Sequence, residues 1–421
     1  MKMMKLSSLG TLRNGMNYDK SSAVCGCKII GVADFGNRVF PDYDSLSEID
    51  SSIVTKDDLL QNGDIVFVRS NGNKNLVGRT MFIHDIKDPV CYSGFCIAFR
   101  PNTDLVYPEY LFYVLRAPFC KKQYGYSQQT NITNLSQGVL GDVDVPVPDL
   151  DTQQKLAKIL SEIDLKIISN TRICVELEAM AKTLYDYWFT QFDFPNAEGK
   201  PYCSSGGEMV WNDQLKRKIP KGWDVRPLSH VISSINTGLN PRDNFILGNG
   251  DIQYLTVKNL TTSGTIDFSG CDTVDEQARE IIHKRSDVSV GDILFASIAP
   301  LGRCYLIQNP PEKWDINESV FSIRRNAFRV TSEFLYMYFM SDTFIKAATS
   351  SSTGSIFKGI RINTLLDIAA VIPPKDIVTA FTTQVKTLLA LKEQKGTENR
   401  ELTKLRDWLL PVLMNGQATV E

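Results

Sequence analysis

The sequence predicts an α+β protein in which two related mixed α/β domains are each followed by a long helix. Three observations support this prediction: an internal repeat, strand-like runs at the start of each copy, and a heptad pattern after each copy. The chain has 421 residues, which corresponds to two or three domains of ordinary size. Its 43% hydrophobic and 22% charged residues are typical of a globular protein and exclude a disordered or fibrous chain.

The internal repeat consists of short segments that recur in the same order at a shift of roughly 225 residues. Short matches arise by chance, but a common order and a nearly constant shift do not. The matched pairs are Asn62-Gly-Asp-Ile-Val-Phe67 with Val290-Gly-Asp-Ile-Leu-Phe295, Val77-Gly-Arg79 with Leu301-Gly-Arg303, Glu109-Tyr-Leu-Phe112 with Glu333-Phe-Leu-Tyr336, and Val145-Pro-Val-Pro148 with Val371-Ile-Pro-Pro374. We therefore interpret the chain as two copies of one unit rather than a short-period solenoid.

Each copy begins with runs rich in valine, isoleucine and phenylalanine, separated by glycine, asparagine and aspartate, which is the pattern of strands. Strands are predicted over 64–68, 94–99 and 292–295. A helix is predicted in each copy, over 108–122 and 331–348, before a proline-marked stop. On these boundaries the first domain comprises residues 1–150 and the second 221–375, with a linker at 191–220.

A heptad pattern follows each proline stop and predicts long helices over 151–190 and 376–421. Because the two patterns share one frame, we expect the helices to pair, although each could instead cover only its own domain. A helix of this length would be on the order of 55–60 Å long, which suits a spacer between domains. The predicted packing positions are, at a, Leu156, Ile163, Asn170, Leu177, Leu184, Phe381, Leu388, Lys395, Leu402 and Leu409, and, at d, Ile159, Ile173, Met180, Tyr187, Leu391, Leu405 and Val412.

The charge and cysteine content narrow the possible function. A formal charge of -2, from 46 Lys+Arg against 48 Asp+Glu, excludes the cationic coat of a nucleic-acid packaging protein, so any polyanion must be bound through local patches. The nine cysteines and the absence of a signal-peptide pattern indicate free thiols in a reducing cytoplasm. No apolar run is long enough for a membrane span.

The most specific motifs lie between the first helix and the second copy. They are Tyr185-Asp-Tyr-Trp-Phe-Thr-Gln-Phe-Asp-Phe-Pro195, Gly199-Lys-Pro-Tyr202, Ser204-Ser-Gly-Gly-Glu-Met-Val-Trp211 and Ile219-Pro-Lys-Gly-Trp223. This run resembles the central conserved region of the specificity subunits of Type I restriction-modification enzymes. The Gly-Asp-Ile/Leu-Phe element of each half and the helix start Gln153-Gln-Lys-Leu156 agree, so the resemblance covers essentially the whole chain. It departs where the second helix lacks the paired glutamine and where Gly396 is expected to interrupt that helix.

The resemblance implies a non-catalytic subunit without a cofactor, with two target recognition domains that each read one half of a split, asymmetric site in double-stranded DNA. Two antiparallel coiled-coil helices would separate these domains, set the spacing of the half-sites and dock two modification subunits, which are methyltransferases. Restriction subunits, which translocate and cleave DNA, are possible further partners. Domains held by a rigid spacer can read major-groove edges about a helical turn apart.

Two loops in each copy are the candidate DNA contacts, because their Arg and Lys side chains suit phosphates and guanine while Gln and Asn suit adenine. The first loop of each copy is 69–79 or 297–303, and the second is 121–131 or 349–361. A solvated loop without base contacts is the alternative for any single residue. The candidate residues are Arg69, Asn71, Lys74, Arg79, Lys121, Lys122, Gln128, Gln129, Asn131, Arg303, Lys358 and Arg361.

Other functions are weaker matches to the sequence. Asn309-Pro310-Pro311 resembles the core motif of an adenine methyltransferase, but Glu312 occupies the place of the stacking aromatic, so we interpret it as a surface turn. The cysteines and histidines lack metal-ligand spacing, and no metal site is expected. A stand-alone methyltransferase and a protein-interaction scaffold that never reads DNA remain the alternatives.

Overall fold

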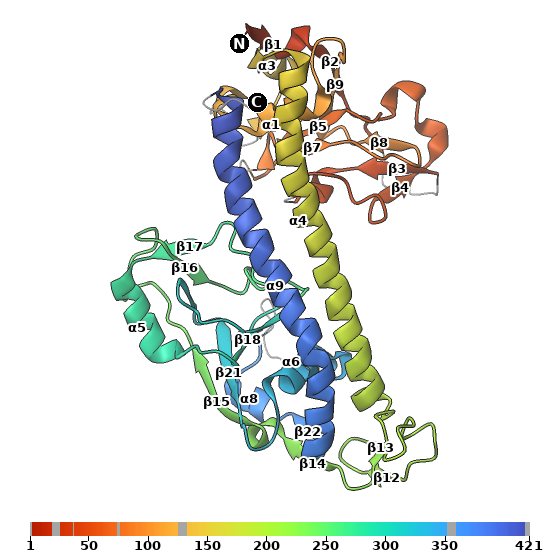
Figure 1. Ribbon diagram of the computed structural model, residues 1–421, viewed down its shortest axis with the longest axis vertical. Helices are drawn as coiled ribbons and strands as arrows, with labels where there is room; N and C mark the ends of the chain where they lie inside the picture. The colour runs from red at the N-terminus through yellow and green to blue at the C-terminus, as the bar shows by residue number, and fades with distance from the viewer. Residues whose placement is uncertain are drawn as a thin grey trace. The chain divides into compact units, whose positions relative to one another are not determined.

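The computed structural model describes residues 2–18, 26–36, 38–73, 76–124, 133–351 and 359–416. The chain forms two compact units. Unit 1 comprises Met1–Ile168 and Asn399–Glu421, and unit 2 comprises Ser169–Glu398. Each unit therefore contains one of the two predicted domains and a segment of both long helices (Figure 1). Among the described residues, none of the helices combines the length and the hydropathy needed to cross a bilayer.

Unit 1 is built on a four-stranded antiparallel sheet in the order β2-β9-β5-β7. A second sheet, β4-β3-β8, contains one parallel pair, β3 with β8, and two short pairs, β1-β11 and β6-β10, complete the domain. The strands are β1 (Lys2–Lys5), β2 (Gly10–Asn14), β3 (Cys27–Ile30), β4 (Ser47–Ile49), β5 (Ile65–Val68), β6 (Ser70–Asn71), β7 (Thr80–Phe82), β8 (Val90–Tyr92), β9 (Cys96–Pro101), β10 (Thr133–Asn134) and β11 (Asp144–Val147).

Unit 2 repeats both larger sheets and the β1-β11 pair, and it has an isolated bridge in place of the β6-β10 pair. Its four-stranded sheet has the order β15-β21-β18-β19, its three-stranded sheet the order β17-β16-β20 with β16 and β20 parallel, and β14 pairs with β22. A separate hairpin, β12-β13, lies in the segment before the domain. The strands are β12 (Met209–Asn212), β13 (Arg217–Pro220), β14 (Asp224–Pro227), β15 (Ile232–Thr237), β16 (Ile252–Leu255), β17 (Asp272–Val274), β18 (Ile293–Ala296), β19 (Cys304–Leu306), β20 (Trp314–Ile316), β21 (Val320–Arg325) and β22 (Ala369–Ile372). The shared topology confirms the α+β fold with two repeated domains.

Two of the predicted helices are broken. The helix predicted over 108–122 ends at Arg116 and restarts at Pro118, because a proline inside a helix removes a hydrogen bond and disfavours the helical conformation of the preceding residue. The helix predicted over 331–348 is interrupted at Ser341, whose hydroxyl caps the second piece at the Phe344 amide. The helices are α1 (Pro108–Arg116), α2 (Pro118–Tyr124), α3 (Gln137–Gly141), α4 (Leu150–Tyr185), α5 (Glu276–Ser286), α6 (Ser332–Met340), α7 (Asp342–Ser351), α8 (Ile362–Leu366) and α9 (Lys375–Met414).

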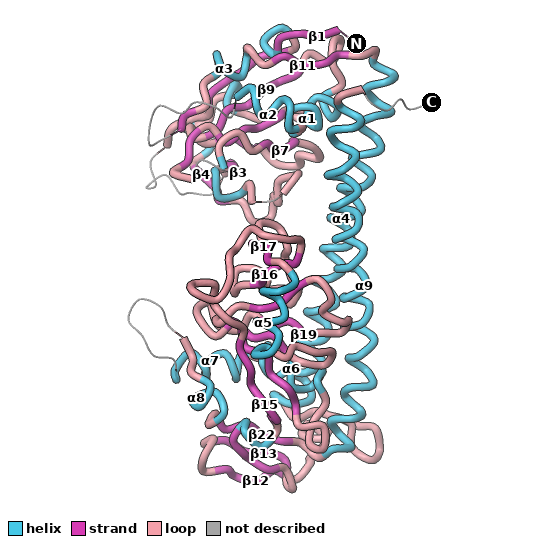
Figure 2. Tube along the Cα trace, turned by 90° about the vertical axis from the view of Figure 1, so that its left-hand side faces the viewer, coloured by secondary structure: helices cyan, strands magenta, loops and turns pink. Residues whose placement is uncertain are grey.

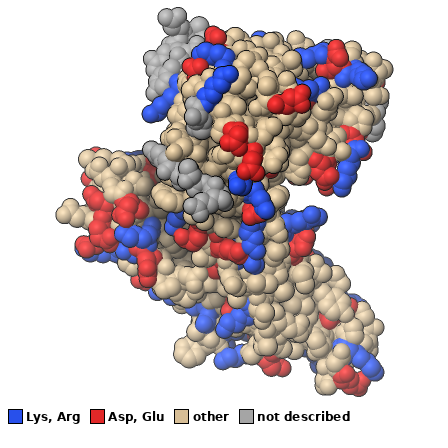
Figure 3. Space-filling view, turned by 45° about the horizontal axis from the view of Figure 1, so that its top comes forward, with Lys and Arg blue, Asp and Glu red and all other residues tan. Residues whose placement is uncertain are grey.

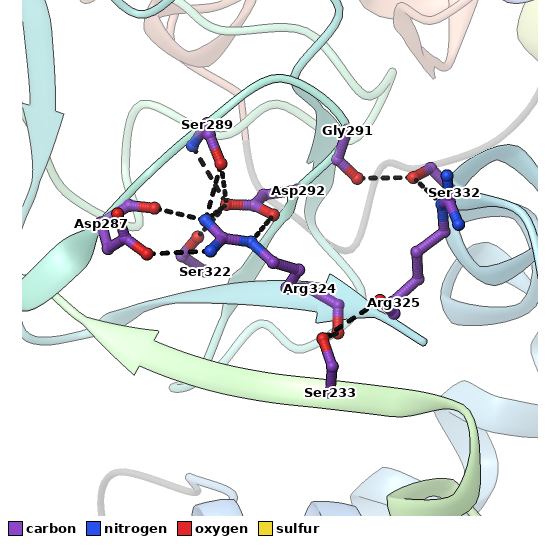
Figure 4. A network of polar contacts seen from close by, with 9 residues as sticks. All are labelled: Ser233, Asp287, Ser289, Gly291, Asp292, Ser322, Arg324, Arg325 and Ser332. Atoms are coloured by element: carbon purple, nitrogen blue, oxygen red, sulfur yellow. Dashed lines mark hydrogen bonds and ion pairs between the residues drawn. The ribbon is translucent and has the colours of Figure 1, made fainter. Parts of the chain in front are cut away.

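The Gly-Asp element of each copy is a structural turn. Gly63 and Gly291 adopt φ values of 95° and 91°, which glycine tolerates best. The following aspartates, Asp64 and Asp292, are 1% and 2% exposed. In unit 2, Arg324 of β21 donates Nε and Nη2 to the Asp292 carboxylate at 2.8 Å each (Figure 4). In unit 1, Arg100 of β9 donates to the Asp64 carboxylate in the same way. In each unit the motif therefore connects the turn before one strand to the adjacent strand: β5 to β9 in unit 1, and β18 to β21 in unit 2.

The long helices α4 and α9 pair antiparallel within each unit, and both views show them side by side (Figures 1 and 2). In unit 1, Leu156 of α4 shares a core with Leu413 of α9, whereas Asp164 contacts Arg406, so the order along α9 is reversed. In unit 2, Glu178 of α4 pairs with Lys392 of α9. The helix α9 is continuous through Gly396, so the expected interruption is wrong. A single glycine costs about 1 kcal/mol in a helix, which the apolar packing of a helix of this length outweighs.

The buried face of the helices differs from the predicted heptad at the d positions. Met180 of α4 and Tyr187 of the π-helical turn after it are 57% and 37% exposed, and Leu391 and Leu405 of α9 are 39% and 44% exposed. In four of the five heptads the second buried position lies four residues after a, at Leu160, Cys174 and Ala181 of α4 and at Trp188 in the turn that follows. Of the predicted a residues, Leu156, Asn170, Leu177 and Phe381 are buried, whereas Ile163, Leu184, Leu388, Lys395, Leu402 and Leu409 are half-buried.

The aromatic run after α4 forms part of the core of unit 2. It begins with a π-helical turn over Asp186–Thr190, in which Trp188 and Phe189 are buried. The Phe189 ring lies 4.9 Å from that of Phe381 at the start of α9 and 5.0 Å from that of Phe334 in α6. The run therefore joins both long helices to the second domain within unit 2, which explains its aromatic composition.

Candidate nucleic-acid interface

In each copy, the start of the first candidate loop pairs with the segment at or just after the end of the second. In unit 1, β6 at the start of the first loop pairs with β10 at the end of the second, and the Leu135 amide donates to the Arg69 carbonyl at 2.8 Å. In unit 2, Ile298 forms a bridge with Gly359, and the Ile360 amide donates to the Ser297 carbonyl at 2.9 Å. The fold thus joins, in each unit, two segments that are far apart in the sequence.

Arg69, which the sequence predicts to contact DNA, also makes hydrogen bonds within unit 1. Its side chain is half-buried, and its Nη1 donates to the Gly94 carbonyl at 3.3 Å, while its backbone amide donates to the Phe95 carbonyl at 2.8 Å. Arg69 therefore anchors the turn between β8 and β9 beside the first loop. The Phe95 ring in this turn is 62% exposed, and sequence analysis missed it. An aromatic residue directly after a glycine, between two predicted strands, was the available signal.

Cations gather beside the second loop of unit 1. Burial lowers the pKa of Lys121 in α2, and the nearby charges of Arg116 and Arg79 lower it further. Burial also lowers the pKa of Arg116, whose guanidinium lies 5.1 Å from the centre of the Phe112 ring. Its Nη1 atom is buried without a hydrogen-bond partner among the described residues. Asp164 attracts Arg116 and Asp407 attracts Lys121, so carboxylates of this chain offset part of the repulsion. We name Arg79, Arg116 and Lys121 the cation cluster of unit 1.

Sequence analysis did not identify Arg116 as a candidate contact, because it is the last residue of a helix whose other residues are mostly apolar and belong to the core. Arg79 is one of the predicted DNA contacts. Its Nη1 donates to the Gly36 carbonyl, and this bond holds the guanidinium at the surface of unit 1. Lys122 is exposed. Asn71 is half-buried, and its side-chain oxygen accepts from the Asn73 amide at 2.8 Å. The predicted contacts Lys74, Gln128, Gln129 and Asn131 lie outside the described residues.

The corresponding region of unit 2 carries a different set of side chains. Arg303 is half-buried, and its Nε has no hydrogen-bond partner in the part of the chain that the structure describes. Arg361 is exposed and directly precedes α8. Lys358 lies outside the described ranges. The equivalent of Phe95 at the start of β21 is Ser319, so the two units present different chemistry at the same place in the fold.

The charges elsewhere on the surface are mixed. Figure 3 shows blue basic and red acidic side chains interspersed on the face that it draws. This distribution agrees with the nearly neutral composition, and it leaves local groups such as the cation cluster of unit 1 as the places where a polyanion would bind.

Large apolar side chains are exposed along both long helices, away from the faces that pair. Such residues, rimmed by polar side chains, are typical of surfaces that bind other proteins. In unit 1 they are Leu150, Leu165, Ile168, Leu405 and Trp408, and in unit 2 Val175, Met180 and Leu391, together with Tyr187 in the π-helical turn after α4. Trp408 is the most exposed of these, at 63%.

The sequence matches to catalytic motifs have structural roles. The Asn309 amide donates to Glu393 of α9 at 3.3 Å, and the Pro311 carbonyl accepts from Arg279 at 2.9 Å, so the Asn-Pro-Pro segment forms a packed surface turn. His283 contacts the buried Asp315 at 3.1 Å, and Asp315 in turn accepts from Ser286. Within the described ranges, no group of three or more His, Cys, Asp or Glu side chains has the arrangement of a metal site.

Comparisons with known proteins agree on one family. The profile of the Type I restriction modification DNA specificity domain matches residues 1–179 and 220–403. The MjaIX specificity subunit of Methanocaldococcus jannaschii is 26% identical over 320 residues, which cover 76% of this chain and 71% of that protein. The HindI specificity subunit of Haemophilus influenzae is 23% identical over 414 residues, covering 85% and 87%. The crystal structure of a Type I S subunit from M. genitalium has a similar fold, with a TM-score of 0.57, 15% identity and coverage of 98% and 96%.

Proposed function

Because the chain belongs to the family of Type I restriction-modification specificity subunits, we propose that each of its units reads one half of a bipartite DNA site. The observation that carries this proposal is the pairing of two donor-bearing loops at the same place in both units. Loops on a rigid scaffold can present Arg, Lys, Asn and Gln side chains to phosphates and to base edges in the major groove. Two sites built alike but lined differently would read two different half-sites.

The cation cluster of unit 1 supports a role in holding DNA phosphates. Like charges repel one another, and a DNA phosphate would offset the part of this repulsion that Asp164 and Asp407 leave. The poorer charge of the corresponding region in unit 2, with Arg303 and Arg361, favours a half-site in which base contacts and partner subunits supply more of the affinity. The target sequence would therefore be asymmetric.

The exposed apolar residues of α4 and α9 support docking of two modification subunits, one at each unit. Each unit presents such residues on both helices, so two partners of one kind could bind in equivalent ways. In this proposal the partners are methyltransferases that bring their own cofactor, restriction subunits are possible additional partners, and this chain contributes sequence selection without catalysis.

The experiment that tests the proposal is single-molecule sequencing of methylated adenines in cells that carry this chain together with a modification subunit. We expect methylation at a split site with two different half-sites and a constant unread spacer. Methylation that is absent, or that follows the modification subunit when this chain is replaced by another specificity subunit, would contradict the proposal.

Replacing Arg79 and Lys121 by alanine should weaken DNA binding of the assembled complex. Each lost phosphate contact removes about 0.9 from the slope of log K against log salt concentration, so the double variant should lose about two. The measurement is a binding titration at several salt concentrations. The control is Lys56→Ala with Lys87→Ala, two exposed lysines elsewhere in unit 1. A slope equal to that of the control would remove the cluster from the interface.

Replacing Phe95 by alanine should lower DNA affinity roughly fivefold, because burying part of an exposed phenylalanine against a base contributes about 1 kcal/mol. The thermal stability of the chain should change little, since the ring is already 62% exposed. The matched control is Phe328→Ala, which removes an 86% exposed ring that lies after β21, at the opposite end of the equivalent strand. Equal affinities of the two variants would exclude Phe95 from the contact.

A further inference from the structure

A buried ion pair joins the two long helices in unit 2. The carboxylate of Glu178 in α4 accepts a hydrogen bond from the Tyr336 hydroxyl of α6 at 2.9 Å and contacts the Lys392 ammonium of α9. Lys392 also donates to the Tyr336 oxygen at 3.1 Å. Glu178 and Lys392 are 8% and 4% exposed. A side chain at Gly264 would overlap the Tyr336 hydroxyl, so the turn at Gly264 covers this group and keeps water out.

Unit 1 contains a group of the same composition. The Tyr113 hydroxyl of α1 donates to Asp164 of α4 at 2.9 Å, and Arg406 of α9 donates to the other carboxylate oxygen at 2.8 Å. Asp164 is 1% exposed. Each unit thus has a triad made of a tyrosine from the domain, a carboxylate from α4 and a cation from α9. The two triads are spaced by two heptads on both helices.

The internal repeat does not explain these triads. In the frame that matches Leu156 with Phe381, the triad residues of one helix correspond to uncharged residues of the other. The counterparts of Asp164 and Glu178 are Leu389 and Thr403, and those of Lys392 and Arg406 are Ile167 and Ala181. The sign of the buried charge therefore follows the helix and not the repeat: both carboxylates belong to α4 and both cations to α9.

The placement of both carboxylates on α4 and both cations on α9 distinguishes the observed pairing from two alternative pairings of the helices. The two helices have similar apolar patterns, so apolar packing alone would also permit a slip by one heptad, or the pairing of α4 with α4 of a second chain. A slip by one heptad places Asp164 opposite Asn399 or Leu413. Self-pairing of α4 puts Ala181 and Ile167 where the cations now lie. In either alternative Glu178 loses its cation, and Asp164 loses Arg406 and keeps only the nearby charge of Arg116 in α1. A buried carboxylate that loses its cation is strongly unfavourable.

We propose that the two triads are pairing determinants, which hold α4 against α9 of the same chain in one register and exclude slipped or self-paired helices. A contribution to net stability is a weaker explanation, because a buried ion pair often contributes no more than apolar residues of equal size. Buried polar groups in paired helices are best known for selecting register and partner. Asp164, Glu178, Lys392 and Arg406 are then positioning residues for the spacer between the two DNA-reading units.

The test replaces both triads by apolar residues in the full-length chain. The variant carries Asp164→Leu, Arg406→Met, Tyr113→Phe, Glu178→Met, Lys392→Met and Tyr336→Phe. Nitroxide labels on non-natural residues at the exposed positions Val175 and Ala380 report the register in unit 2, since a slip of one heptad changes their distance by about 10 Å. Light scattering reports the mass of the chain.

The wild type and a control with Lys158→Met and Glu162→Met, an exposed pair on α4, should each give one label distance and one mass. The apolar variant should give a second distance or a dimer that grows with concentration. A single wild-type distance together with an unchanged mass would overturn the proposal.

A charge reversal gives an independent test if the apolar variant fails to fold. Glu178→Lys alone places like charges opposite each other in the native register and should broaden the distance distribution or raise the mass. Adding Lys392→Glu should restore the wild-type values. Identical distances and masses for the single and double variants would also overturn the proposal. Both measurements are made without DNA, so they can fail while the proposed function stands.

Discussion

Inserting one heptad into α4 after Ile168 and one into α9 after Glu398 should lengthen the unread spacer of the DNA site by about three base pairs. Seven helical residues add about 10 Å, and each base pair adds about 3.4 Å. The loops that we propose to read bases lie outside the insertions, so the half-sites should keep their sequences. Mapping of methylated adenines in the assembled complex measures both properties at once.

The new site should also be methylated more weakly, because three base pairs turn one half-site by about 100° relative to the other. A seven-residue insertion in the exposed turn at Asn196–Lys200, which belongs to neither long helix, is the matched control and should leave the spacer unchanged. An insertion in α4 alone should prevent assembly, since it takes Asp164 or Glu178 out of register with its cation. An unchanged spacer after the paired insertions would contradict the idea that the helices set it.

Replacing Asp292 by alanine should lower the free energy of unfolding of unit 2 by about 3 kcal/mol, because a buried charge loses its partner. The Asp292 carboxylate accepts from Arg324 at two positions, from the Ser289 amide and hydroxyl, and from the Ser322 hydroxyl (Figure 4). We take the low end of the range for buried pairs because the Arg324 side chain is 36% exposed and water can replace part of what is lost. Urea unfolding measures the change.

The matched control is Asp287→Asn, which removes the second acidic partner of the same arginine. Asp287 is 59% exposed, so its ion pair with Arg324 at 2.8 Å should contribute less than about 1 kcal/mol. Asparagine is chosen because Asp287 has a φ of 44°, a conformation that asparagine tolerates. Equal effects of the two substitutions would show that burial of Asp292 does not determine the stability of this turn.

The fold was predictable from the sequence because its signals are local. Alternation between apolar runs and Gly-Asp turns identifies strands such as β5 and β18, and the proline stops precede the start of α4 and α9. The repeat showed that the strands belong to two copies of one arrangement. The candidate loops were identified in the same way, as polar segments between strands. In each unit the fold then joined two of them through β6 with β10 and through Ile298 with Gly359.

The sequence by itself determined that this chain has two related domains and two long amphipathic helices. Which side of each helix is buried was decided only by the tertiary structure, because α4 carries apolar residues both three and four positions after most a residues, as at Met180 and Ala181. The burial of Arg116 and the assembly of the two triads were also decided only by the tertiary structure. A buried charge is tolerated where a residue of opposite charge from a distant segment contacts it, and a local sequence pattern does not indicate such a contact.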